Sequence, residues 1–153
     1  RTFASVPSRS LVKTFEDRIR LTGYDLAVGE RQFADQVPQA KAGDVLSVTL
    51  HWQAVSEMSV NYTVFAQVLN ASGRLVAQDD SPPQQGKAPT TAWVRDEVVV
   101  DRHDVRLPAD IPPGDYTIIT GIYDAATGKR LAVQGGGDFV AISALKVLSG
   151  GAP

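Results

Sequence analysis

The sequence has no cysteine and only two histidines, His51 and His103, among its 153 residues. Without cysteine the chain can have no disulfide, no thiol nucleophile and no thiolate ligand for a metal. Two histidines are too few to indicate a zinc site, which needs three or four nitrogen, sulfur or oxygen ligands. We therefore expect both histidines to be structural or surface residues.

An excess of charge of one sign is also missing, as are long apolar runs. Fifteen basic and seventeen acidic side chains give a net charge of -2, which leaves no broad positive field for a nucleic acid. No apolar run approaches the roughly 20 residues that cross a bilayer. We predict no nucleic-acid partner and no membrane span within this chain.

The sequence lacks the spacing-specific motifs of enzymes. It contains no GxSxG elbow, no P-loop, no HExxH and no GxGxxG followed by a helix. A glycosidase needs two carboxylates about 5 to 9.5 Å apart, and the many Asp residues do not identify such a pair. We predict that the fragment is non-catalytic. A stand-alone glycoside hydrolase is a less favoured hypothesis, ranked after the two function classes given at the end of this section.

What the sequence does have is alternation of apolar and polar residues, most clearly from Val45 to Val55. A period of two places one set on the buried face of a strand and the other on its wet face. The apolar set is Leu46, Val48, Leu50, Trp52 and Ala54, and the polar set is Ser47, Thr49, His51 and Gln53. This pattern predicts a strand of an antiparallel sheet with Trp52 in the core.

Similar runs follow along the chain, separated by turn residues. Strands are predicted at 17–28, 45–55, 61–70, 74–79, 97–107, 115–124, 130–133 and 138–148. A β-bulge is expected at Thr22-Gly23, where the alternation changes phase, and Gly73 is expected to supply a positive φ in a hairpin turn. The spacing predicts an all-β fold, an antiparallel β-sandwich of about eight strands with jelly-roll or immunoglobulin-like topology.

The chain divides into one predicted domain and two flanking segments. Residues 1–16 are expected to be a linker or edge segment, 17–148 the β-sandwich domain, and 149–153 a disordered tail. Because the chain begins with Arg1 and has no signal-like apolar segment, we expect it to be a fragment of a longer precursor or a processed product.

The longest irregular segment runs from Asp79 to Asp96 and is the leading candidate for a ligand site. Trp93 offers a flat apolar ring and one N–H donor, which suits stacking on a sugar. Gln85, Lys87 and Asp101 are the polar groups proposed to bind the ligand with it. The alternative is that Trp93 pins its loop onto the edge of the sandwich.

Calcium is the one ion that the acidic residues suggest, because it accepts six to eight hard oxygen ligands from irregular loops. The candidate ligands are Asp79, Asp80, Asp104 and Asp124. No contiguous ligand motif is present, and Asp at strand ends commonly caps turns. We therefore expect no cofactor, with calcium kept as the alternative.

A set of short motifs resembles one known kind of module. The motifs are LTGYDL (21–26), VTLHWQA (48–54), NYTVFAQVLN (61–70), GRLVAQDDSPP (73–83), PTTAW (89–93) and LPADIPPGDYTIITGIYDAATGKRL (107–131). Together they resemble the soluble C-terminal β-sandwich module of multi-spanning bacterial glycosyltransferases of the protein mannosyltransferase type. The resemblance covers roughly residues 17–148. This chain has Asp96 where that pattern has a glycine before the Glu.

The resemblance implies an accessory domain on the extracytoplasmic face of a bacterial membrane, with the catalytic acids in a membrane portion of the same polypeptide. Two function classes follow. In the first, the domain holds a glycan or acceptor, which predicts an open groove with an exposed aromatic ring. In the second, it is a structural or protein-interaction sandwich with Trp93 buried and the face of Ser47, Thr49, His51 and Gln53 solvated or packed on a partner.

Overall fold

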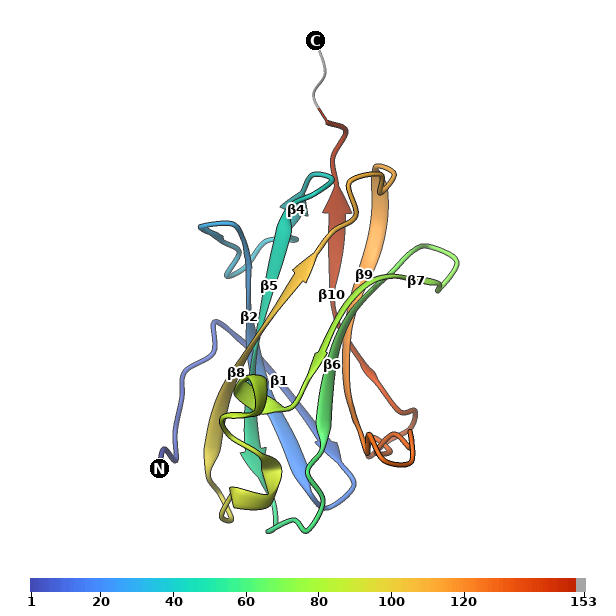
Figure 1. Cartoon of the computed structure of the whole chain (residues 1–153). Coiled ribbons are helices and arrows are strands. Elements are labelled where there is room, and N and C mark those ends of the chain that lie inside the picture. Colours follow the sequence, from blue (N-terminus) through green and yellow to red (C-terminus); the bar gives the residue numbers. More distant parts are fainter. Residues whose placement is uncertain (151–153) are drawn as a thin grey trace.

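The computed structural model describes residues 1–150, which fold into two β-sheets packed face to face (Figure 1). The predicted disordered tail therefore lies mostly outside the described residues. The strands are β1 (Arg9–Phe15), β2 (Ile19–Val28), β3 (Arg31–Gln32), β4 (Gln39–Ala40), β5 (Val45–Ala54), β6 (Thr63–Leu69), β7 (Leu75–Ser81), β8 (Val98–Arg106), β9 (Gly114–Tyr123) and β10 (Val140–Val147). The all-β sandwich prediction is confirmed.

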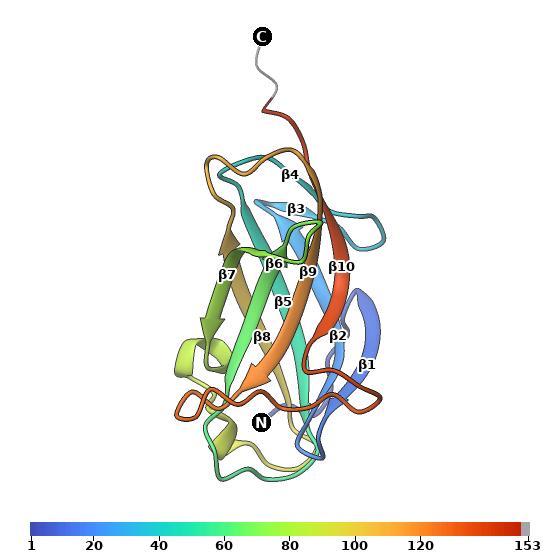
Figure 2. The same ribbon diagram turned by 90° about the vertical axis from the view of Figure 1, so that its right-hand side faces the viewer.

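Sheet A has the strand order β1-β2-β5-β8, with β3 paired to β2, and sheet B has the order β4-β10-β9-β6-β7. Figure 2 looks onto sheet B. The β6–β7 hairpin of sheet B separates β5 and β8 in the chain, yet these two strands are antiparallel neighbours in sheet A. The chain therefore crosses between the sheets in the manner of a Greek key. The short β4 pairs with β10 in parallel, whereas the other strand pairs are antiparallel.

The core lies between the sheets and is built from the inward residues of each strand. Trp52 is fully buried, as predicted, and its ring meets Phe15 edge-on with 5.7 Å between centroids. The Tyr24 hydroxyl donates a hydrogen bond of 2.6 Å to the carbonyl oxygen of Ile142 and so joins the two sheets. The interior is filled by side chains, so ligand sites are to be sought on the outer surfaces.

Several local predictions are confirmed and others are wrong. The register shifts between Leu21 and Gly23, which is the expected bulge, and Gly73 takes a φ of 79° in the β6–β7 turn. Residues 130–133 were expected to form a strand but make only the isolated bridges Tyr123↔Arg130 and Phe15↔Val133. Three consecutive glycines with positive φ, residues 135–137, come after Gln134 and end the extended run. Two-residue strands such as β3 and β4 are too short to show alternation.

The long connection after β7 contains two 3-10 turns, η1 (Pro83–Gly86) and η2 (Thr90–Ala92). Gln84 and Gln85 within η1 both have left-handed backbone conformations, with φ of 53° and 59°. Asp96 at the end of the connection has a φ of 68°. Aspartate tolerates this region better than most residues, so Asp96 takes the conformation that a glycine adopts easily.

Residues 1–8, which we call the strap, run from the start of β8 across sheet A to β1. The Val98 N–H donates to the Thr2 carbonyl oxygen at 2.8 Å, and the Ser8 N–H donates to Asp25 Oδ1 at 2.7 Å. Pro7 lies on Gly23, where a Cβ atom would come within 2.4 Å of the proline ring. The segment expected to be a linker or edge segment thus contributes an edge strand, β1, and a packed strap.

Candidate functional site

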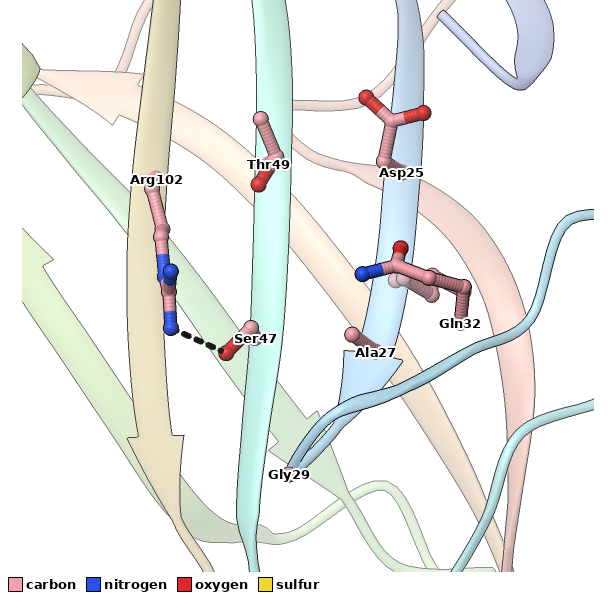
Figure 3. Close-up of a pocket in the computed structure, with 8 residues that line it drawn as sticks. Asp25, Ala27, Gly29, Gln32, Ser47, Thr49 and Arg102 are labelled. Atoms are coloured by element: carbon pink, nitrogen blue, oxygen red, sulfur yellow. Dashed lines mark hydrogen bonds between the residues drawn. The ribbon is translucent and has the colours of Figure 1, made fainter.

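The outer face of sheet A carries an array of polar side chains, which we call the polar array: Asp25, Ser47, Thr49, Arg102 and Asp104. They come from three adjacent strands, and the strand register places Asp25 opposite Thr49, Thr49 opposite Arg102, and Ser47 opposite Asp104. Because side chains alternate along each strand, these residues point away from the core on the same face. Figure 3 shows most of them around one hollow.

The hollow is shallow and borders the β2–β3 turn. Gln32 on β3 reaches over β2 beside Ala27, and Gly29 forms the turn with a φ of 57° (Figure 3). The enclosed volume is about 80 Å³, well below the roughly 300 to 1,000 Å³ of pockets that enclose a small molecule. This surface can contact one side of an extended ligand but cannot surround it.

Arg102, Asp104 and Ser47 form a connected group at one end of the array. Arg102 Nε donates to Asp104 Oδ1 at 2.8 Å, Arg102 Nη2 donates to Ser47 Oγ at 3.2 Å, and the Ser47 hydroxyl donates to Asp104 at 2.8 Å. Partial burial acts to raise the pKa of Asp104, but the hydrogen bonds from Arg102 and Ser47 outweigh it and the pKa is lowered. The carboxylate therefore remains an acceptor at neutral pH.

Asp25, His51 and Ser5 form a second group beneath the strap. His51 Nε2 lies 2.6 Å from Asp25 Oδ2, and His51 Nδ1 lies 2.7 Å from the Ser5 hydroxyl. Burial acts to raise the pKa of Asp25, whereas the hydrogen bonds from His51 and from the Ser8 N–H lower it, and the net shift is downward. The strap thus uses the same carboxylate that borders the hollow.

The polar array supplies both kinds of hydrogen-bonding group on a nearly flat surface. Carboxylates accept, the guanidinium donates, and the partly exposed Thr49 hydroxyl can do both, so the surface suits a ligand with many hydroxyl groups. Asp25 and Asp104 both have a lowered pKa, whereas the general acid of a glycosidase needs a raised one. The array is therefore suited to binding rather than to acid catalysis.

The structure places the four predicted ligand residues apart from the polar array. Trp93 is 3% exposed and its Nε1 donates to the Ala88 carbonyl oxygen at 2.9 Å. This burial is what the loop-pinning alternative expects, and it leaves no free ring face for a sugar. Asp101 is fully buried, whereas Gln85 and Lys87 are exposed in and beside η1.

Each of the four candidate calcium ligands makes a contact within the protein. Asp79 faces His103, Asp80 accepts from the Tyr123 hydroxyl, Asp104 binds Arg102, and Asp124 caps its turn through the Ala126 N–H. Across residues 1–150, no three His, Asp or Glu side chains converge where they could hold a metal ion.

His103 lies at the centre of a buried network between the two sheets. Its Nε2 is 2.6 Å from Asp101 Oδ2 and its Nδ1 is 2.9 Å from Asp79 Oδ2. Asp101 also accepts from Trp52 Nε1 at 3.3 Å and from the Gln84 N–H at 2.7 Å. Burial acts to lower the pKa of His103, but the hydrogen bonds and charges of Asp101 and Asp79 raise it overall. This network explains the position of Asp101 without a ligand.

Sequence reasoning missed Asp25, Gln32 and Arg102 as members of the candidate site. The alternation along residues 101–104 was the available signal for Arg102. Asp101 and His103 are buried, so Arg102 and Asp104, which alternate with them, point to the outer face. Ser47 and His51 were expected to be exposed, but they are 6% and 4% exposed. Arg102 bonds to Ser47, and the strap covers His51.

The fold and the face together define an antiparallel β-sandwich domain with a polar outer sheet. The C-terminal domain of Wzt has a similar structure, with a TM-score of 0.64 and 15% identity over 95% of this chain and 84% of that one. A β-glucuronidase from glycoside hydrolase family 2 matches with a TM-score of 0.51 and 11% identity over 72% of this chain and 10% of that one. A Niemann-Pick type C2 protein from Japanese carpenter ant matches with a TM-score of 0.50 and 10% identity over 95% and 100%.

These identities are low, so the similarities establish the fold and no more. No protein-family model matches the sequence, and no curated protein matches it either. Among residues 1–150, no helix is long and apolar enough to span a membrane.

Proposed function

We propose that this domain is a non-catalytic glycan-binding module, which holds a saccharide chain against the outer face of sheet A. The observation that carries the proposal is the polar array, where two ionised carboxylates, a guanidinium and hydroxyl groups share one face. Saccharide hydroxyls both donate and accept, so they match such a mixed surface. The shallow hollow suits a chain that lies along the sheet rather than a sugar enclosed in a pocket.

We further propose that the domain is an accessory part of a membrane-bound glycosyltransferase-like protein and lies on the extracytoplasmic side of a bacterial membrane. The set of sequence motifs that resembles such modules supports this placement, and the sandwich fold agrees with it. The partners are then a glycan or acceptor and the membrane portion of the same polypeptide. Protease accessibility of the domain in spheroplasts that produce the whole parent protein tests the placement.

A protein-interaction module is the second candidate, and one observation favours it. The strap is an extended peptide that already lies on sheet A and bonds to Asp25 and His51. A face that holds one peptide segment has the groups to hold another. On this alternative, the polar array binds the backbone and side chains of a partner protein instead of sugar hydroxyls.

Glycan-array binding of the domain, with calcium and with a chelator, tests the proposed function. Arg102→Gln removes the charge and the two donors to Asp104 and Ser47 at an exposed position. We expect it to weaken binding roughly tenfold, the effect of about 1.4 kcal/mol. Arg74→Gln is the matched control, because Arg74 is also exposed but lies in the β6–β7 turn of the other sheet.

Binding that Arg102→Gln weakens and Arg74→Gln preserves supports a saccharide site on sheet A. Binding that is unchanged in Arg102→Gln would show that the polar array is not the glycan-binding site. The protein-interaction alternative replaces the proposal if the glycan array shows no binding and a partner protein protects the backbone amides of sheet A from hydrogen exchange.

A further inference from the structure

A second hollow lies on the outer face of sheet B, on the side of the molecule that Figure 2 presents. Its volume is about 220 Å³, larger than that of the hollow on sheet A. Strands β6, β7 and β9 and the turn after β9 contribute its lining residues, which are Phe65, Gln67, Asp80, Tyr123, Gly128 and Arg130. None of the functions considered above uses this surface.

The base of the hollow is an aromatic ring that orients a cation. Phe65 lies opposite Gly121 in the strand register, and a Cβ atom on residue 121 would come within 2.2 Å of the Phe65 ring. The absence of that Cβ lets the ring pack directly against β9. The guanidinium carbon of Arg130 then sits 4.3 Å from the centre of the Phe65 ring, a cation–π contact that restricts its orientation.

A carboxylate is oriented beside this guanidinium. Asp80 lies opposite Phe65 on the neighbouring strand, and its Oδ2 accepts a hydrogen bond of 3.0 Å from the Tyr123 hydroxyl. Its Oδ1 makes no hydrogen bond within residues 1–150. Burial first, and then the bond to Asp80, raise the pKa of Tyr123, so the hydroxyl keeps its proton and continues to donate. One acceptor and one cationic donor are thus held on the same small surface.

We propose that this hollow binds a neutral pyranose through two adjacent hydroxyl groups. Asp80 Oδ1 accepts from one hydroxyl and Arg130 donates to the other, while Gln67 at the edge offers its amide oxygen as an acceptor, since its Nε2 donates to Gln78 Oε1 at 3.4 Å. Arg130 Nη1 also donates to Asp138 Oδ1 at 3.4 Å, so two carboxylates lie beside one guanidinium, which favours a neutral sugar over an acidic one. The site is separate from the polar array on sheet A, and the inference does not depend on the proposed function.

Amide chemical shifts of the isotopically labelled domain provide the test, because they report which residues each sugar contacts. The probes are methyl α-glucopyranoside and its 3-deoxy analogue, which has no pair of adjacent hydroxyls because O3 belongs to both pairs, O2/O3 and O3/O4. We expect saturable shifts at Asp80, Tyr123, Gly128 and Arg130 with the first probe, and binding weakened about tenfold with the 3-deoxy sugar or with Asp80→Asn. Asp115→Asn is the matched control, since it removes an exposed carboxylate at the other end of β9.

Tyr123→Phe separates positioning from folding. It deletes only the hydroxyl that orients Asp80, so we expect weaker sugar binding with little change in the urea midpoint. Shifts confined to residues of sheet A would overturn this inference and leave the proposed function standing. The absence of shifts around Asp80 and Arg130 up to the solubility limit of the sugar would also overturn it, as would equal effects of Asp80→Asn and Asp115→Asn.

Discussion

The chain uses the same chemical unit, a histidine beside aspartate, in two different surroundings. His51 lies on the outer face of sheet A, where Asp25 is partly exposed and the strap supplies Ser5 as the other partner. His103 lies inside the sandwich, fully buried, with a carboxylate at each ring nitrogen. Both ring nitrogens of His103 can donate to carboxylates only when the ring is protonated. The outer network fixes the strap to sheet A, whereas the inner network joins the two sheets and η1.

Replacing each histidine by alanine is the strongest test of this comparison. His103→Ala leaves Asp101 buried without its main partner, and breaking such a buried pair costs about 3–5 kcal/mol. In His51→Ala, Asp25 keeps its hydrogen bond from the Ser8 N–H and some contact with water. We therefore expect the free energy of unfolding to fall by only about 1–2 kcal/mol. Urea unfolding measures both losses. Equal losses in the two variants would show that the inner network does not carry the larger share of stability.

The strap offers a way to break the outer network without touching its hydrogen-bonding groups. In Gly23→Ala the new Cβ would meet both the Pro7 ring and the Arg9 carbonyl oxygen at 2.4 Å. We expect the strap to be displaced, at a cost of about 1–3 kcal/mol for an overpacked site. Hydrogen exchange should then show faster exchange of the strap amides, above all of the Ser8 N–H that donates to Asp25.

The control for that variant is Gly29→Ala, at the β2–β3 turn, where a Cβ would meet nothing within 4 Å. Its strain arises only from its positive φ, so the strap should stay protected. If Gly23→Ala leaves strap protection unchanged, Pro7 does not depend on the missing Cβ at Gly23.

The inner network should also make stability depend on pH in a predictable direction. The folded protein raises the pKa of His103 above its unfolded value near 6.5. The stabilisation of the fold by protonated His103 is therefore fully present below pH 6.5. It is lost as pH rises through the folded pKa, at up to about 1.4 kcal/mol per pH unit. Urea unfolding between pH 6 and 9 should show this decline in the wild type and not in His103→Gln.

The outer network titrates at the opposite end of the pH scale. The pKa of Asp25 is lowered, so its contribution is present above its ordinary value of 3.8 and is lost as pH falls through the folded pKa. A His51 variant should therefore flatten the acid limb of the stability curve and leave the alkaline limb unchanged. A His51 variant that changes the alkaline limb would contradict the assignment of that limb to His103.

The sequence predicted the sandwich well because burial on one face leaves a period of two, and turn residues mark the ends of strands. Trp52 and the bulge at Gly23 follow from that period. The polar array could not be assembled in the same way, since it depends on the lateral order β2-β5-β8, and alternation within a strand does not encode which strands are neighbours.

Tertiary contacts also determine whether the candidate ligand residues in and after the long connection, Trp93 and Asp101, are accessible. Its composition indicated a loop with a prominent tryptophan, but the Trp93 N–H finds its acceptor, the Ala88 carbonyl, within the same segment. Asp101 was chosen for its carboxylate, and only the position of β7 beside β8 shows that Asp101 bonds to His103, which also bonds to Asp79. Residue type gave the chemistry, and packing decided whether a ligand can reach it.

The smallest expected effect concerns η1, which the inner network fixes through the bond from the Gln84 N–H to Asp101. Gln84 and Gln85 both adopt left-handed conformations, which cost an L-residue about 1–2 kcal/mol and a glycine nothing, although glycine loses about 0.5–1 kcal/mol in chain entropy. Gln85→Gly should therefore stabilise the fold by about 0.5 kcal/mol. Gln84→Gly should gain less, because it also deletes the hydrogen bond of 2.9 Å from Gln84 Nε2 to the Val100 carbonyl. Paired urea titrations can resolve that order, and a reversed order would mean that the Gln84 side chain does not hold η1 against β8.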